Sequence, residues 1–140
     1  MVMARGTRFA AFAAAAFAAV GSGALAGALS QVTPGLWEIS GIPGAHVPAK
    51  ACYASLDQLE QYEHRGLACT RKVLSDAGTT LIVQYSCGGH GFGRSQVTAI
   101  TPRSLRIETQ GISDGLPFNY LLQARRVGDC AAKSVSLNGH

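Results

Sequence analysis

Residues 101–110 read Thr-Pro-Arg-Ser-Leu-Arg-Ile-Glu-Thr-Gln, a tight turn followed by alternating apolar and polar side chains. Proline at the second position of Thr101–Ser104 favours a β-turn. Beyond the turn, Leu105, Ile107 and Thr109 share one face of a strand, and arginine, glutamate and glutamine occupy the other. This alternation is typical of a strand with one buried and one solvated face. The stretch therefore predicts an antiparallel sheet that is covered on one side.

The same alternation recurs on both sides of this stretch. We expect further strands at residues 35–40, 47–53, 69–75, 79–87, 95–101 and 118–127. Asp76-Ala77-Gly78 and Ser113-Asp114-Gly115 separate neighbouring strands and predict hairpin turns. The glycine-rich run Gly88–Gly93 is interpreted as a loose connection between strands.

One helix interrupts the series of strands. Ser55 is expected to be its N-cap, with Gln58 three residues later as in a capping box, and Gly66 is expected to end it. Six or seven short strands with one early helix predict a mainly β fold. We expect an antiparallel meander that curls into an open or closed barrel around the short α-helix or a small cavity.

The first 26 residues have the layout of a secretory signal peptide. Two arginines precede an unbroken apolar run from Phe9 to Val20, and Ala24-Leu25-Ala26 offers small residues at the positions that signal peptidase recognises. We expect cleavage after Ala26, with Ala28 as the second choice, and retention as an uncleaved anchor as the alternative. Export places the protein in the periplasm.

Removal of the signal leaves the length of one domain. We expect a leader at residues 27–33, a single disulfide-stapled β domain at 34–130 and a disordered tail at 131–140. Subtracting Arg5 and Arg8 from the 12 basic residues leaves ten against eight acidic residues. No basic tract is interleaved with aromatic residues, so no nucleic-acid partner is expected. No later apolar run is long enough to span a membrane.

Four cysteines in an exported domain predict two disulfides. Cys69 and Cys87 lie about equally far from the turn at Gly78, which favours a bridge between them across the hairpin. Cys52 and Cys130 would then form the second bridge, although three pairings are possible. No pair has the Cys-x-x-Cys spacing of a redox dithiol.

Two rival hypotheses assign chemistry to the same part of the chain. His64 and His90, together with Cys69 and Cys87, have the types and spacing of a tetrahedral zinc site. Oxidation of the cysteines competes with that site.

A hydrolase would need a nucleophile, a base and an orienting acid. Ser95, His90 and Asp114 can be named for these roles, but nothing in the sequence brings them together. Glu60 and Glu63 are interpreted as part of a solvated helix face. We therefore expect no catalytic site, no bound metal and no cofactor.

Pro34-Gly35-Leu36-Trp37-Glu38 and the order of the cysteines resemble the family called "domain of unknown function 3617", small exported proteins of Gram-negative bacteria. Its members begin with Pro-Gly-Leu-Trp-Glu, carry one cysteine before a short helix, and have two more that bracket a strand pair. They end with a basic strand that runs into Gly-x-Cys. The matching positions here are Cys52, Cys69, Cys87 and Gly128-Asp129-Cys130, so the resemblance spans residues 34–130.

The chain departs from this family in one respect, because a Pro-Gly-Asp ending after the last cysteine is missing. The resemblance implies a periplasmic, disulfide-bearing β domain whose role is unassigned. It supplies no catalytic residues.

The function expected from these features is non-enzymatic. Many alternating strands and few polar constellations favour a domain that binds a small apolar ligand or another envelope component. The alternatives are an interaction module that uses an exposed sheet edge to join an envelope protein, and a hydrolase or metal-binding protein. The aromatic residues expected to line the core or a ligand cavity are Trp37, Tyr85, Phe92, Phe118 and Tyr120.

Overall fold

A computed structural model describes residues 27–131 of the 140-residue chain. The signal peptide expected at residues 1–26 lies outside the described residues. So does the segment 132–140 of the expected disordered tail. Both stay predictions.

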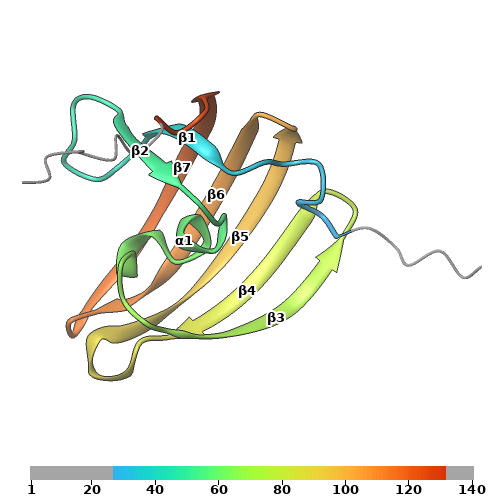
Figure 1. Cartoon of the computed structure of the whole chain (residues 1–140). Coiled ribbons are helices and arrows are strands. Elements are labelled where there is room, and N and C mark those ends of the chain that lie inside the picture. Colours follow the sequence, from blue (N-terminus) through green and yellow to red (C-terminus); the bar gives the residue numbers. More distant parts are fainter. Residues whose placement is uncertain (1–26, 132–140) are drawn as a thin grey trace, which may run out of the picture.

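Seven strands and three short helical segments make up the described chain (Figure 1). The strands are β1 (Gly35–Ser40), β2 (Ala49–Tyr53), β3 (Thr70–Ala77), β4 (Thr80–Ser86), β5 (Gly91–Thr101), β6 (Ser104–Ser113) and β7 (Leu116–Gly128). The helical segments are α1 (Asp57–Glu60) and the 3₁₀ turns η1 (Tyr62–His64) and η2 (Gly88–His90).

All strands belong to one antiparallel sheet in the order β2-β1-β7-β6-β5-β4-β3. β3 to β7 form an uninterrupted meander, and the first strand, β1, then pairs with the last strand, β7. The sheet curls around α1 without closing, because β2 and β3 do not pair with each other (Figure 1). The prediction of a mainly β, open, antiparallel fold with one short helix is confirmed.

The core lies on the concave side of the sheet, which we call the inner face. Leu81, Val97, Ile107 and Leu122 are register partners across β4, β5, β6 and β7, and each is at most 5% exposed. Trp37 of β1, Leu59 of α1 and other apolar residues pack against this row. Burial of these side chains is the main force that stabilises the fold.

The helix is shorter than expected and begins differently. Leu56, not Ser55, precedes α1, and the Ser55 hydroxyl accepts a hydrogen bond from the amide of Asp57 at 3.2 Å. The Gln58 side chain does not complete a capping box, because its oxygen accepts from the amide of Gly66 at 2.9 Å. The predicted helix is therefore present, but the prediction that Ser55 is its N-cap is wrong.

The glycine-rich run is also more regular than expected. β5 begins at Gly91, four residues before the predicted start, and the amide of Cys87 donates to the carbonyl of Gly91 at 2.8 Å. Gly91 has a φ of 120°, which glycine adopts without strain. The loose connection is thus confined to η2.

Both disulfides have the pairing that the sequence favours. Cys69 and Cys87 bridge the chain on either side of the β3–β4 hairpin, and Cys52 and Cys130 join the end of β2 to the chain after β7. The second bridge spans 78 residues of sequence. It ties the strand at one edge of the sheet to the last strand of the meander.

The expected leader is an integral part of the domain. Ala28 and Val32 are 7% and 6% exposed and belong to the core cluster. Amides of Ser30 and Val32 donate to the carbonyls of Gly27 and Leu29, which makes residues 27–32 a compact turn. We call residues 27–32 the N-terminal turn. In Figure 1 it lies beside the end of β3.

Candidate functional site

The aromatic residues expected to line the core or a cavity occupy three different surroundings. Trp37 is fully buried in the main core, and its indole Nε1 has no hydrogen-bond partner among the described residues. Tyr85, Phe118 and Tyr120 gather on the inner face near η1 and η2. Phe92 points the other way and is 50% exposed on the convex, outer face, so of its two expected surroundings, core or cavity, the core is excluded.

Two glycines make room for the aromatic rings on the inner face. Gly93 and Gly111 are register partners, with Tyr85 beside Gly93 on β4 and Phe118 beside Gly111 on β7. A methyl group on Gly93 would overlap the Tyr85 ring, and one on Gly111 would overlap the backbone of Phe92. The missing side chain of Gly93 therefore leaves room for the Tyr85 ring, and that of Gly111 leaves room for the backbone of β5 and the edge of the Phe118 ring.

His64 of η1 packs onto these rings. Its imidazole meets Tyr85 and Phe118 edge to face, with centroid distances of 5.5 and 5.8 Å, and the residue is 3% exposed. Nε2 lies 3.0 Å from the carbonyl oxygen of His90. A carbonyl only accepts, so Nε2 donates to it, and Nδ1 lies 3.3 Å from the Tyr85 hydroxyl. Both ring nitrogens therefore have a partner, and the imidazole holds η1 against the sheet.

The tyrosines of this cluster keep their protons at neutral pH. Burial raises the pKa of Tyr85 to about 12. The Tyr120 hydroxyl donates to Glu63 Oε2 at 2.6 Å, and burial together with this bond raises its pKa well above the ordinary value. Neither side chain therefore supplies a phenolate, and both hold η1 in place through hydrogen bonds of their hydroxyl groups to His64 and Glu63.

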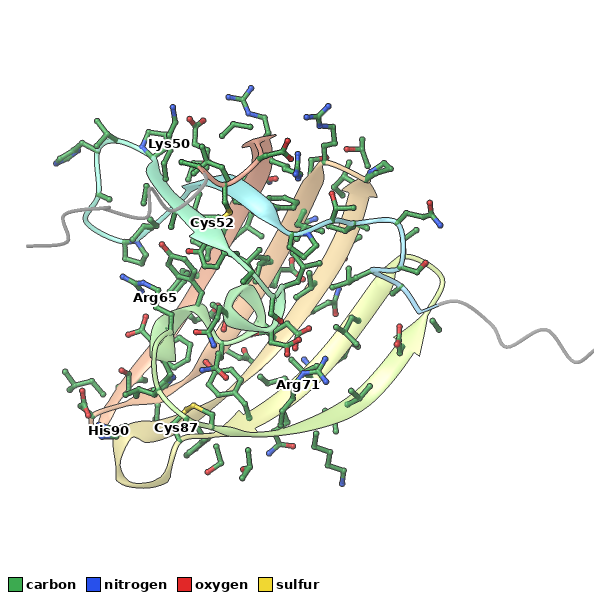
Figure 2. All side chains as sticks on the ribbon, in the orientation of Figure 1. Lys50, Cys52, Arg65, Arg71, Cys87 and His90 are labelled. Atoms are coloured by element: carbon green, nitrogen blue, oxygen red, sulfur yellow. A yellow bond between two sulfur atoms is a disulfide. The ribbon has the colours of Figure 1, made fainter. Side chains whose placement is uncertain are left out.

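A buried ion pair connects α1 to the edge strand β3. Glu60 is 3% exposed, and Arg71 Nη2 donates to its Oε1 at 3.0 Å. Figure 2 shows Arg71 reaching from β3 toward α1. Burial raises the pKa of Glu60, and the hydrogen bond and charge of Arg71 counter part of that rise. The interpretation of Glu60 as a solvated helix residue is wrong.

The residues named for catalysis and metal binding are not brought together as those hypotheses require. Ser95 is fully buried and donates to Thr109 Oγ1 at 2.9 Å, whereas His90 is exposed on the surface 3.5 Å from Asp114. The disulfide between Cys69 and Cys87 removes both thiolates from the zinc set. In residues 27–131 no cluster of three or more histidines, cysteines, aspartates or glutamates could hold a metal.

A hollow on the outer face combines apolar and charged groups. It has a volume of about 490 Å³ and is lined by Phe92, Arg94, Gln110, Ile112 and Asn119, with Gly93 and Gly111 in its floor. We call it the outer-face hollow. Its volume lies within the range of about 300–1,000 Å³ that is usual for small-molecule sites.

The two ends of the outer-face hollow differ in character. Phe92 and Ile112 are register partners and form an apolar end, while Arg94 and Gln110, the next outward pair, form a polar end. Arg94 makes no hydrogen bond or ion pair with any residue in the described part of the chain. A second hollow of about 380 Å³ adjoins it and shares Arg94, Gln110 and Asn119. The apolar end formed by Phe92 and Ile112 thus lies next to an Arg94 guanidinium that has no partner among the described residues.

The sequence itself contains a signal for this site. Extending the alternation of residues 95–101 back through the glycine run places Phe92 and Arg94 on the solvated face together. The role of His64 had no such signal, because its partners come from η2, β4 and β7.

Comparison of the chain with protein-family models, with curated proteins and with solved structures gives no match. Among the described residues no helix is long and apolar enough to cross a membrane.

Proposed function

We propose that this chain is an exported, periplasmic, non-enzymatic domain that binds a small amphiphile in the outer-face hollow. The proposal includes removal of residues 1–26 as a signal peptide and membership of the "domain of unknown function 3617" family. Two disulfides support export, because cytosolic thiols are kept reduced.

One observation carries the binding proposal: a half-exposed phenylalanine and an unpartnered arginine face the same hollow. Covering the half-exposed Phe92 ring with an apolar group removes apolar surface from water, which favours binding. Arg94 is positioned to form charge-assisted hydrogen bonds with an anionic head group. Gln110 and Asn119 add amide donors and acceptors at the polar end. The ligand is therefore a molecule with an apolar body and an anionic head.

The inner face offers less support for an apolar ligand, since core side chains and the rings of Tyr85 and Phe118 fill the space beneath α1 and η1. The edge strand β3 also offers less support for a strand-adding partner. β3 carries Lys72 and an irregularity between Val73 and Ser75, and both features hinder pairing with another chain.

The test is a titration of the purified mature domain with decanoate, followed by amide chemical shifts. We expect shifts centred on β5 and β6 around Arg94 and Gln110. Phe92→Ala and Arg94→Gln should each weaken binding about tenfold, through lost apolar burial and lost charge-assisted bonding respectively.

Matched controls distinguish binding at this site from non-specific binding of the amphiphile. Ile100→Ala removes another exposed apolar side chain of β5, and Arg103→Gln removes an exposed arginine of the next turn; both should leave the affinity unchanged. Decyltrimethylammonium has the same chain length and the opposite charge, and should bind more weakly than decanoate. Equal binding of the two amphiphiles, or equal effects of test and control variants, would refute the proposal.

A further inference from the structure

Gly27, the first described residue, lies against the carboxylate of Asp76 near the end of β3. The amide of Ala28 donates to Asp76 Oδ1 at 2.6 Å. A methyl group placed on Gly27 would come within 2.9 Å of Asp76 Oδ2, so the Cα of Gly27 itself is next to the carboxylate. The backbone nitrogen of Gly27 is bonded to that Cα.

Asp76 has no cation paired with it in the part of the chain that the structure describes. Arg71, the basic residue of β3 on the same face, pairs with Glu60 instead. Asp76 adds to the negative potential at Glu60 and Arg71, which places all three charged groups in one neighbourhood. Asp57 acts on Glu60 and Arg71 in the same way, so this neighbourhood has three carboxylates for one guanidinium.

We propose that signal-peptide cleavage after Ala26 creates an α-ammonium group on Gly27 that pairs with Asp76 and locks the N-terminal turn onto β3. Signal peptidase adds water across the Ala26–Gly27 peptide bond, which leaves a carboxylate on Ala26 and an amine on Gly27. An α-amino group has an ordinary pKa of about 7.7–8.0, so this amine takes up a proton at neutral pH. Opposite charges within about 4–6 Å stabilise each other.

The N-terminal turn supports the position of the cut. Cleavage after Ala28 would delete both residues that contact Asp76, together with a side chain that is only 7% exposed. It would also remove the Gly27 carbonyl that accepts from Ser30. Cleavage after Ala26 preserves all of these contacts and adds the missing cation.

The inference rests on the export proposed above, and the first experiment separates the two. The intact mass of the protein from the periplasmic fraction is measured under denaturing conditions. A chain that starts at Gly27 is the expected result. A chain that starts at Leu29 would overturn the inference and leave export standing, and an uncleaved chain found outside the periplasm would overturn export itself.

The second experiment tests the ion pair without relying on export. Two chains are released from a removable fusion, one starting at Gly27 and one carrying the additional Ala26, and each is made with Asp76 and with Asp76→Asn. The extra residue moves the ammonium group away from Asp76. With Asp76 present, we expect the additional Ala26 to raise the unfolding equilibrium constant, measured in urea, about fivefold. With Asp76→Asn, we expect no difference between the two starts.

Asp114→Asn is the matched control, because Asp114 is an exposed acid on a turn whose positive φ of 46° asparagine tolerates. In that background the fivefold effect of the extra residue should persist. An effect of equal size with Asp76 and with Asp76→Asn would show that Ala26 acts by crowding the turn, and would overturn the pairing.

Discussion

At the scale of single residues, this domain satisfies buried polar side chains through partners that are distant in sequence. His64 bonds to Tyr85 and to the carbonyl of His90, and Glu60 bonds to Arg71. An imidazole and a carboxylate, each 3% exposed, would be costly without these partners. The burial of His64 and Glu60 could not be predicted from the sequence, because helix periodicity does not reveal which side chains of a helix distant strands will cover.

The raised pKa of Glu60 predicts a pH dependence of stability. The folded protein holds this proton more tightly than the unfolded chain, whose ordinary value is 4.5. The resulting stabilisation is fully present below pH 4.5 and is lost as the pH rises through the raised folded value. Urea midpoints of the wild type and Glu60→Gln, compared from pH 4 to 7, should show the wild type losing stability relative to the variant. A relative gain with rising pH would show that Arg71 outweighs burial.

At the scale of elements, the strands were predictable because alternation determines which face of each strand is buried. Leu105, Ile107 and Thr109 are all at most 1% exposed, as their alternation with polar residues predicts. The helix was less predictable, since a four-residue α1 followed by η1 depends on tertiary contacts more than on capping. The outward direction of Phe92 was missed because the glycines around it were interpreted as a loop, whereas Gly91 and Gly93 belong to β5.

The paired glycines of β5 and β6 predict a sharp packing effect. Gly93→Ala should lower the free energy of unfolding by about 1–3 kcal/mol, because its methyl group must displace the Tyr85 ring from a filled space. Gly89→Ala is the matched control: nothing lies within 4 Å of its added methyl group, so its effect should stay within about 0.5 kcal/mol. Urea unfolding of both variants makes the comparison. Equal stabilities of Gly93→Ala and Gly89→Ala would mean that the Tyr85 ring moves aside at no cost in free energy.

At the scale of the whole molecule, the fold is an incomplete barrel whose open side is held by covalent and charged links. Cys52–Cys130 ties β2 to the end of β7, and Glu60–Arg71 ties α1 to β3. Sequence spacing predicted six or seven strands, of which the structure has seven, and favoured the disulfide pairing that is observed. It predicted neither the pairing of β1 with β7 nor the placement of the N-terminal turn, because no local pattern encodes which distant strands become neighbours.

The two disulfides should contribute unequally to stability. Closing a loop of 78 residues restricts the unfolded chain more than closing one of 18, so Cys52→Ala with Cys130→Ala should cost more than Cys69→Ala with Cys87→Ala. Each loss should be about 2–4 kcal/mol, measured by urea unfolding of the two double variants. A larger loss from the shorter bridge would show that strain or residual structure, rather than loop closure, dominates.

The pairing of the first strand with the last has a consequence for when folding can finish. β1 can pair with β2 early, but its second partner is the stretch 123–128 of β7, so a chain that emerges N-terminus first waits for nearly all of its length before the sheet can be completed. Contacts of such long sequence separation slow folding, because the loop must close before the contact stabilises it. For the export proposed above, this topology would leave the sheet incomplete until almost the whole chain had crossed the membrane.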